Sequence, residues 1–211
     1  MDSIIVFGAG GRAGRRVVTE ALRRGHRVTS VVRDPARYPD LGGTVVSGDV
    51  TDPAAVAKLA GGHDAAVHAA ARLDVPAAEF FPAAARALTG GLVTAAVPRL
   101  VAIGIGTTLE VAPGLALHDT PDFPAEHLAF SRGHAAQIDV LRAADDALDW
   151  VLLVPPPVFL DDTSAGTGRY RTGAGQVLPG DAPFPYADLA VAIVDEAADP
   201  RHHRAVVAVG P

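Results

Sequence analysis

The feature that most constrains the fold is a glycine-rich stretch, VFGAGGRAGRRV at residues 6–17. The chain enters it from the apolar run SIIVFG at residues 3–8 and leaves it into a basic, amphipathic stretch. A strand that turns sharply through glycines into a helix is typical of the start of a βαβ unit, whose strands lie parallel in a sheet. The rest of the chain should therefore supply further pairs of strands and helices.

The remaining sequence does alternate short β-branched runs with longer alanine-rich stretches. Strands are predicted at 3–8, 27–33, 43–49, 64–70, 99–105, 149–155 and 204–210, and helices at 12–24, 53–60, 77–96, 124–146 and 186–198. Two strands are continuous apolar runs, as expected when helices cover both faces of the sheet. The pattern predicts an α/β fold: a Rossmann-like, doubly wound parallel sheet with strand order 3-2-1-4-5-6, in a single domain over residues 1–211.

Local signals mark several helix ends. Pro53 directly follows an acidic residue and marks a helix start, while Gly25 is a good stop for the helix over 12–24. Tyr186, which follows a proline, begins the last predicted helix. Gly90 and Gly91 weaken the helix over 77–96 and leave a division of it open.

The alternating pattern fails over residues 155–185, which are rich in proline, glycine and aspartate. A loop of this length in a compact domain is usually functional or disordered. It follows the sixth strand, at the sheet edge where doubly wound folds bind ligands. We expect a small lid on the substrate side, with a hairpin around GRYRTG.

Composition narrows the class of partner. The net charge is −6, so no broad basic field is available to bind a nucleic acid. The chain has no cysteine, and its longest apolar stretch, WVLLVPPPVFL, is too short and too rich in proline to span a membrane. We expect a soluble cytoplasmic protein with a small-molecule substrate, no nucleic acid, no membrane and no metal, and a homodimer remains open.

The glycine stretch fits two dinucleotide-binding registers. Gly8, Gly10 and Ala13 match GxGxxA, while Gly8, Gly11 and Gly14 match GxxGxxG. Both supply a tight turn, a bare backbone for a pyrophosphate and close packing of helix on strand. The helix that follows would point its free N–H groups at the phosphates. A glycine-rich turn without a ligand is the alternative.

The end of the second strand, VVRDP, bears on the choice of coenzyme. An acidic residue there binds the ribose of NAD, whereas an arginine accommodates the 2′-phosphate of NADP. Arg33 precedes Asp34, so NADP(H) is favoured over NAD(H), although the two could simply form a surface ion pair. Arg12 could also reach a phosphate.

Several segments, among them VFGAGGRAGRRVVTEALRRGHRVTSVVRDP, LEVAPG, TPDFPAE and TGRYRTG, support a family resemblance. Over nearly its whole length the chain resembles the atypical short-chain dehydrogenase/reductases of the NADH-flavin reductase subgroup. These are relatives of biliverdin reductase B and of the NmrA-like proteins. The resemblance implies an NAD(P)H-binding Rossmann fold.

The resemblance also implies roles for individual positions. The pyrophosphate loop is matched by Gly8, Gly11, Arg12, Ala13 and Gly14, and the residue facing the adenosine phosphate by Arg33. Asp49 and Val50 match the step beside the adenine, and Ala69 and Ala70 the loop against the ribose. Near the nicotinamide it places Thr107, Thr108, Pro155 and Pro156.

One departure from the wider family bears on catalysis. Ordinary short-chain dehydrogenases use a tyrosine, and a lysine four residues later, as proton donor and its tuner. Here Phe130 and His134 fall near those positions, and the single lysine, Lys58, lies far away in the chain. A simple ketone needs a donor as its oxygen becomes charged, whereas a reduced flavin or quinone delocalises that charge. The sequence therefore favours a flavin, quinone or other conjugated acceptor.

Candidate catalytic groups remain. Thr107 or Thr108 could donate a hydroxyl near the nicotinamide, and Thr108 is our candidate for the catalytic one. His134 could supply a proton if it has an ordinary histidine pKa and faces the pocket, or it could be a solvent-facing residue of an amphipathic helix.

For other polar residues, an ordinary structural role is the alternative to a functional one. His118 could line the pocket or be an ordinary loop residue, and Tyr170 could stack on a substrate or pack on the core. The adjacent His202 and His203 cannot converge on one metal.

Three functions stay open at this point. The first is an NAD(P)H-dependent reductase of a conjugated acceptor. The second is a redox sensor of the NmrA kind, which binds the dinucleotide without turnover, as the absent Tyr–Lys pair allows. The third is a non-redox isomerase or cyclase of secondary metabolism on the same fold.

Overall fold

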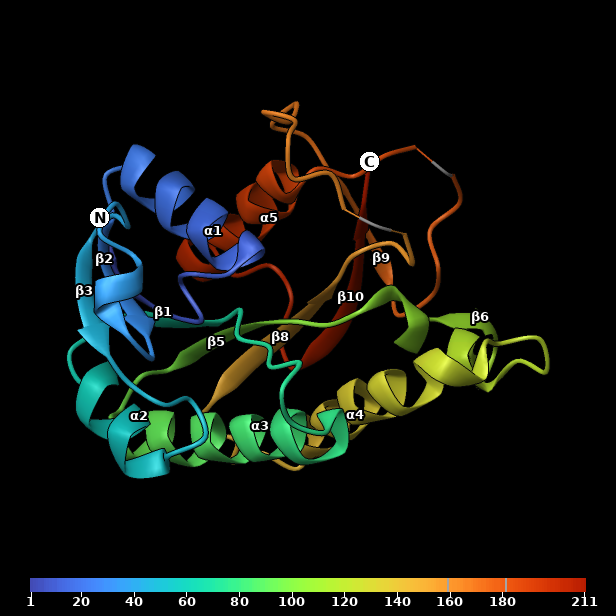
Figure 1. Ribbon diagram of the computed structural model, residues 1–211, viewed down its shortest axis with the longest axis horizontal. Coiled ribbons are helices and arrows are strands. Elements are labelled where there is room, and N and C mark those ends of the chain that lie inside the picture. The colour runs from blue at the N-terminus through green and yellow to red at the C-terminus, as the bar shows by residue number, and fades with distance from the viewer. Residues whose placement is uncertain (159, 181) are drawn as a thin grey trace.

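An eight-stranded sheet forms the centre of the molecule in the computed structural model, which describes residues 1–158, 160–180 and 182–211 (Figure 1). Its strand order is β3-β2-β1-β4-β5-β8-β10-β9. The strands are β1 (Ser3–Phe7), β2 (Arg27–Val32), β3 (Thr44–Ser47), β4 (Ala65–His68), β5 (Arg99–Ile103), β8 (Asp149–Val154), β9 (Arg171–Ala174) and β10 (Ala205–Gly210). Neighbouring strands run parallel except for β9, which is antiparallel to β10. β8 is the sixth predicted strand and β10 the seventh, so the observed order contains the predicted order 3-2-1-4-5-6. The predicted Rossmann-like sheet is therefore confirmed.

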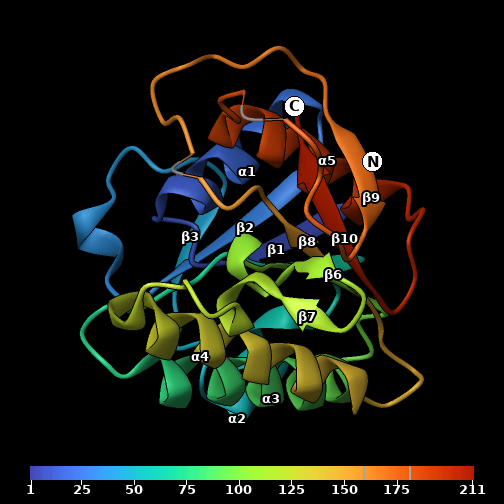
Figure 2. The same cartoon turned by 90° about the vertical axis from the view of Figure 1, so that its right-hand side faces the viewer.

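Helices cover both faces of the sheet. α1 (Arg12–Arg23) and α5 (Tyr186–Ala198) lie on one face, and α2 (Pro53–Ala60), α3 (Ala77–Thr94) and α4 (Ala125–Arg142) lie on the other (Figure 2). Short 3-10 turns η1 (Pro35–Arg37), η2 (Gly106–Thr108) and η3 (Leu117–Asp119) follow β2, β5 and a short hairpin of β6 (Glu110–Ala112) and β7 (Leu115–Ala116). Within the described ranges, none of the helices is both long enough and apolar enough to cross a membrane.

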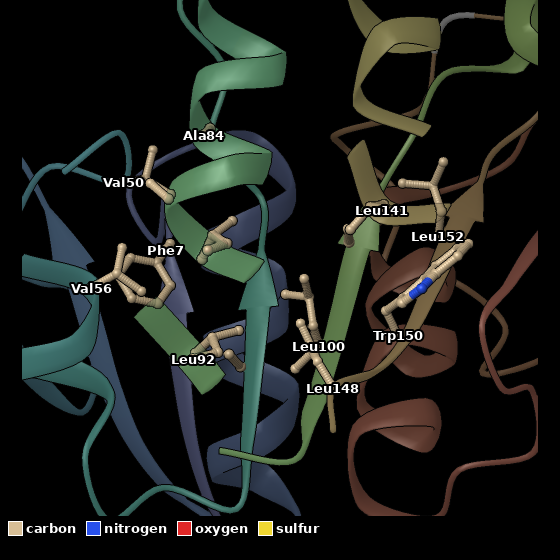
Figure 3. Close-up of a cluster of buried hydrophobic side chains, with 14 of the residues drawn as sticks. Phe7, Val50, Val56, Ala84, Leu92, Leu100, Leu141, Leu148, Trp150 and Leu152 are labelled. Carbon is tan, nitrogen blue, oxygen red and sulfur yellow. The ribbon is translucent and has the colours of Figure 1, made fainter. Parts of the chain in front are cut away.

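Each face of the sheet has its own hydrophobic core. Along β1, Ile5 and Phe7 face the α2–α3–α4 layer, whereas Ile4 and Val6 face α1 and α5. Figure 3 shows the first of these cores, where apolar side chains from the sheet meet those of the helices, among them Phe7, Leu92, Leu100, Leu141 and Trp150. Two covered faces explain why the central strands are continuous apolar runs and do not alternate.

The predicted helix ends are present. Asp52 caps α2, because its carboxylate accepts hydrogen bonds from the N–H groups of Ala54 and Ala55 at 2.9 and 3.2 Å, and Pro53 is the first residue of that helix. Gly25, which follows α1, has a φ of +83°, the left-handed conformation that glycine adopts without strain.

α3 is one continuous helix through Gly90 and Gly91, so the division that the sequence left open does not occur. The two glycines differ in their surroundings. A Cβ on Gly91 would lie 2.7 Å from a Val56 methyl carbon and 2.9 Å from the Pro53 carbonyl oxygen, whereas a Cβ on Gly90 would meet nothing within 4 Å. Gly91 therefore lets α3 pack closely on α2.

We expect opposite effects on stability from an alanine at each of these positions. Gly90→Ala should raise the free energy of unfolding by about 0.4–1 kcal/mol, because it stiffens the unfolded chain and fits open space. Gly91→Ala should lower it by about 1–3 kcal/mol, because the added methyl group overpacks the contact between α2 and α3. Urea unfolding of both variants measures the difference, and equal effects would contradict this account of the packing.

Two parts of the chain differ from the sequence-based prediction. β9 forms no hairpin within the segment 155–185 but adds to the edge of the main sheet, beside β10. A separate two-stranded hairpin, β6 (Glu110–Ala112) and β7 (Leu115–Ala116), was not predicted. Two positions of the predicted lid, 159 and 181, lie outside the described residues.

Candidate functional site

The turn between β1 and α1 is built by two close backbone contacts. Gly8 has a φ of +83°, and a Cβ there would lie 2.4 Å from the backbone of Ala70. A Cβ on Gly14 would lie 2.1 Å from the Gly8 carbonyl oxygen. Gly14 thus gives the close packing of helix on strand that the third glycine of the motif provides, and the geometry supports the GxxGxxG register.

The N-terminus of α1 has the features of an anion site. Gly11 is its N-cap and supplies no side-chain hydrogen bond, and the first turn contains no acidic residue. The first N–H groups of a helix lack partners within the helix, and the helix dipole makes this end positive. A pyrophosphate group therefore fits here, where bare glycine backbone leaves room for it.

A cleft opens beside this turn at the ends of β1, β2, β3 and β4. Seven residues that the sequence analysis assigned to the coenzyme line it, namely Gly8, Gly11, Arg33, Asp49, Val50, Ala69 and Ala70. Residues that sequence reasoning missed also line it, among them Tyr38, Arg72 and Phe80. The cleft brings the pyrophosphate loop together with the positions expected for adenosine.

Tyr38 forms one wall of this cleft against the glycine turn. Its ring lies so close to Gly10 that a Cβ at that glycine would approach the ring to 2.4 Å. Tyr38 follows η1, in a loop without a periodic pattern, so no signal in the sequence pointed to it. Gly10 therefore makes room for a tyrosine instead of packing helix on strand.

The rim of the cleft holds two arginines around one carboxylate. Arg72 contacts the Asp74 carboxylate through two nitrogens, Nε at 3.0 Å and Nη2 at 2.5 Å, and Nη1 of Arg33 lies 3.9 Å from the same carboxylate. The hydrogen bond from Arg72 lowers the pKa of Asp74 to about 2. Because each arginine side chain is partly exposed, both guanidinium groups can reach a ligand at the rim. Arg72 lies four residues after the end of β4, a place where the sequence analysis assigned only alanines.

The surface ion pair considered between Arg33 and Asp34 is not the arrangement seen. The Asp34 carboxylate instead accepts the backbone N–H of Ala36 at 3.1 Å and so caps η1. Asp49 is also engaged locally: hydrogen bonds from the N–H and hydroxyl of Thr51 hold its pKa below the ordinary value. An acceptor carboxylate thus remains ionised where the adenosine is expected.

The other residues predicted for the coenzyme do not line this cleft. Arg12 and Ala13 begin α1, Thr107 and Thr108 lie in η2, and Pro155 follows β8. The turns after β5 and β8 touch, because a Cβ on Gly106 would lie 2.3 Å from the backbone nitrogen of Pro157. These two turns are the ones expected beside the nicotinamide.

The two threonines of η2 use their hydroxyl groups differently. Thr108 donates its hydroxyl to the Ile105 carbonyl at 2.8 Å, inside the turn. The Thr107 hydroxyl is paired at 2.8 Å with the hydroxyl of Ser131 on α4. Thr108 therefore stabilises the turn in this structure, and whether it also acts in catalysis stays a prediction.

His134 is buried, so its interpretation as a solvent-facing residue is wrong. Its ring lies against Phe81 with a centroid distance of 3.6 Å, and Phe130 lies 5.0 Å away. Desolvation, followed by the nearby His68, lowers its pKa to about 3. The ordinary pKa expected for a proton donor is therefore absent, and His134 is neutral at pH 7.

Tyr170 packs against α5. Its hydroxyl donates to the Asp195 carboxylate at 2.6 Å, and burial together with this carboxylate raises its pKa. Of the two alternatives for Tyr170, the structure supports packing on the protein body. The ring is thus not free to stack on a substrate in this conformation.

A parallel sheet with a glycine turn, an uncapped helix N-terminus and a cleft across the strand ends defines a Rossmann-type dinucleotide-binding protein. The family model described as NAD(P)H-binding matches residues 8–200. The chain belongs to this NAD(P)H-binding family.

Individual relatives are similar to this chain over nearly its whole length. YwnB of Bacillus subtilis, itself uncharacterised, is 32% identical over 203 residues, which cover 93% of this chain and 92% of YwnB. A structure from Burkholderia pseudomallei, provisionally named an exported protein, has 35% identity and a TM-score of 0.87, with 99% of each chain covered. One from Streptococcus pneumoniae, provisionally named an NADH-flavin reductase, has 24% identity and a TM-score of 0.85, again with 99% of each chain covered, and shows the common fold.

Proposed function

We propose that the protein is an NAD(P)H-dependent oxidoreductase that reduces a flavin, a quinone or another conjugated small molecule. The observations that carry the proposal are the coenzyme cleft at the ends of β1 to β4 and the contact between the turns η2 and 155–157, which follow β5 and β8 at the same edge of the sheet. The usual tyrosine and lysine are replaced in this chain. The bound coenzyme supplies a hydride. Near the usual positions of that pair are Phe130, which packs against the core, and neutral His134, so an acceptor that delocalises charge suits this site best.

The preference for NADP(H) is part of the proposal. A 2′-phosphate on the adenosine ribose would meet Arg33 and Arg72 at the rim of the cleft, and arginine binds phosphate through two parallel hydrogen bonds. Asp74 holds Arg72 in place while the exposed sides of both guanidinium groups remain available. This arrangement supports a 2′-phosphate more than a free ribose hydroxyl.

We expect Arg33→Asp to weaken NADPH binding by about 1.5–3 kcal/mol, which is roughly 10- to 150-fold, because a charge-assisted contact is lost. NADH binding should change little. Isothermal titration of both coenzymes against both proteins measures this. Arg86→Asp, the same charge change at an exposed position on α3, is the control and should leave both affinities unchanged. Equal losses for NADPH and NADH would refute the assignment.

The segment 155–185 is proposed as the lid over the substrate. Its described part is tied down at two places: Asp188 of α5 accepts the N–H groups of Thr167 and Gly168, and Gly175 pairs through its carbonyl with Glu110 of β6. These contacts bring the segment beside the β6–β7 hairpin, which follows η2 in the chain. A substrate on the nicotinamide side would then lie between the hairpin and the lid.

The function is tested by measuring the oxidation of NADPH from the loss of its absorbance. Flavin mononucleotide, a soluble quinone and a simple ketone are offered as acceptors in separate reactions. Turnover with the first two and none with the ketone is expected. NADPH that binds but is not oxidised by any acceptor would overturn the proposal. The sensor would then be favoured, because Phe130 and His134, near the positions of the usual pair, both pack against the core.

A further inference from the structure

We infer that Ser131 and His118 position Thr107 so that its hydroxyl donates a hydrogen bond to the oxygen of the acceptor on which negative charge collects. Neither Ser131 nor His118 touches the reacting atoms in this account, so both are positioning residues. The inference rests on the proposed reductase function, and it names the group that replaces the missing tyrosine.

Ser131 fixes the direction of the Thr107 hydroxyl. It lies on α4 with 1% of its surface exposed, and its Oγ is 2.8 Å from Oγ1 of Thr107. A buried hydroxyl needs a hydrogen-bond partner, and the Thr107 hydroxyl provides it. When Ser131 donates this bond, Thr107 accepts it and keeps its own hydrogen for another acceptor. Thr107 itself is only half-buried, so that hydrogen can reach a ligand.

His118 fixes the backbone of the same residue. Its Nδ1 lies 2.8 Å from the carbonyl oxygen of Thr107, and the residue is 8% exposed. A carbonyl oxygen can only accept a hydrogen bond, so Nδ1 of His118 must carry a hydrogen and donate it. In the neutral ring, Nε2 is then the nitrogen without a hydrogen. η3, which contains His118, is thereby held on η2 at the residue that Ser131 also contacts.

Two further contacts single out Thr107 within its turn. The neighbouring Thr108 hydroxyl already donates to the Ile105 carbonyl, so its hydrogen is used. Gly106 lies directly against the backbone of Pro157, so the turn cannot shift without moving the segment after β8. Thr107 is thus the hydroxyl of η2 that is held in place and, when Ser131 is the donor of their shared hydrogen bond, keeps a hydrogen for the acceptor.

Beyond this hydrogen bond, the reaction requires no further catalytic group from the protein. The hydride forms a new bond to the acceptor while the coenzyme is oxidised, and the electron pair collects on a conjugated oxygen or nitrogen. A hydrogen bond from Thr107 stabilises that charge as it develops. The proton that completes the reduction comes from water, so no titratable side chain is consumed.

A double-mutant cycle tests the role of Ser131, with flavin mononucleotide as the acceptor. We expect Thr107→Val and Ser131→Ala each to lower kcat by roughly tenfold, the scale of one lost hydrogen bond. The double variant should lose no more than Thr107→Val alone, because Ser131 acts only through Thr107. The inference would be overturned if Ser131→Ala had the kcat of the wild type, or if the loss of kcat in the double variant equalled the product of the two single losses.

The control variant is Thr120→Val. It also removes a hydroxyl beside η3, but that hydroxyl donates to the Leu117 carbonyl and does not contact Thr107. Its kcat should equal that of the wild type. A loss similar to that of Ser131→Ala would mean that any disturbance near η3 slows the reaction, and would overturn the specific role of Ser131.

His118 is tested by two replacements and by a spectroscopic measurement. His118→Asn keeps a side-chain N–H donor and should retain most of kcat, whereas His118→Leu removes the donor and should lose several-fold. Nitrogen-15 NMR of the protein without coenzyme should show the His118 tautomer with hydrogen on Nδ1. The Nε2–H tautomer, or equal activity of both variants, would contradict the contact or its role.

A binding measurement separates failure of this inference from failure of the proposed function. The affinity of oxidised flavin mononucleotide for the NADP⁺-loaded protein is measured by flavin fluorescence, without turnover. Thr107→Val and Ser131→Ala should weaken it at least threefold, while the Kd for NADPH changes less than twofold. Wild-type protein that binds the flavin but does not oxidise NADPH would refute the reductase only. Unchanged flavin affinity in both variants would refute the positioning.

Discussion

Replacing Arg99 with methionine is expected to lower the free energy of unfolding by about 3–5 kcal/mol, because it leaves a carboxylate buried without its partner charge. Arg99 begins β5 and is 4% exposed. Its Nη2 contacts the equally buried Glu196 of α5 at 2.8 Å, and its Nη1 contacts Asp149 of β8 at 2.7 Å. The guanidinium thus joins three elements at the amino end of the sheet.

The two adjacent histidines complete this network. His202 lies 2.6 Å from Glu196 through Nδ1, and His203 lies 2.8 Å from Asp149. The pair therefore contacts two different carboxylates. Each carboxylate around Arg99 has at least one further partner besides the arginine.

Chemical unfolding of three variants separates the possible causes of the loss. Arg142→Met removes an exposed arginine whose nearest carboxylate, Asp139, lies 3.7 Å away, and should change stability by less than about 0.5 kcal/mol. Arg99→Met combined with Glu196→Gln removes the uncompensated charge and should recover part of the stability lost in Arg99→Met. No recovery in the double variant would mean that lost packing, and not a buried charge, accounts for the effect.

All strands of the main sheet except β9 were predictable because their physics is local. Several buried strands, such as SIIVF and DWVLLV, are largely apolar, and each helix is preceded or followed by a proline, aspartate or glycine that marks its end. β6 and β7 were missed because they are three and two residues long and lie in a stretch with no period. β9 depends on pairing with β10, which is distant in the sequence.

The candidate site likewise contains residues that could be predicted from the sequence and residues that could not. The cleft residues that the sequence identified follow the ends of parallel strands, where topology brings them together whatever the loops do. Tyr38 and Arg72 depend on loop conformations that carry no periodic signal. Ser131 was missed and His118 was left open between a pocket residue and a loop residue, because the importance of each lies in contacts with Thr107, 24 and 11 residues away. The burial of His134 depends on Phe81, which belongs to another helix.

That burial leads to a second large effect: mild acid should destabilise the folded protein. The buried rings of His68 and His134 have pKa values lowered to about 4 and about 3, in both cases mainly by desolvation. In the unfolded chain a histidine titrates near pH 6.5, so below that pH the unfolded state binds more protons than the folded state. Stability contributed by these two groups is therefore full above about pH 7 and falls as the pH drops.

The size of this effect follows from the linkage relation. Each imidazole that protonates only on unfolding costs about 1.4 kcal/mol per pH unit below pH 6.5. Between pH 7 and pH 5 the two histidines together should lower the free energy of unfolding by roughly 4 kcal/mol. His134→Phe should remove about half of this loss, because phenylalanine keeps the contact with Phe81 and cannot bind a proton.

Urea unfolding at pH 7, 6 and 5 measures the slope for the wild type and His134→Phe. His127→Phe, at an exposed position of the same helix, is the matched control and should keep the wild-type slope. An unchanged slope in His134→Phe would show that the folded protein protonates this ring as readily as the unfolded chain does, and would contradict its burial as a neutral group.

The same variant decides whether His134 acts in the chemistry. A ring whose pKa is about 3 holds no proton to donate at neutral pH, so turnover with flavin mononucleotide should be nearly flat between pH 6 and 8. His134→Phe should then change kcat by less than about threefold, whereas loss of a general acid costs about 10²-fold or more. A steep decline of wild-type activity above pH 6.5 that the mutation abolishes would restore His134 as the donor. The expected result would mean that His134 makes the folding of the protein sensitive to acid and does not act in catalysis. The burial against phenylalanine side chains that lowers the pKa of His134 also keeps a proton off its ring.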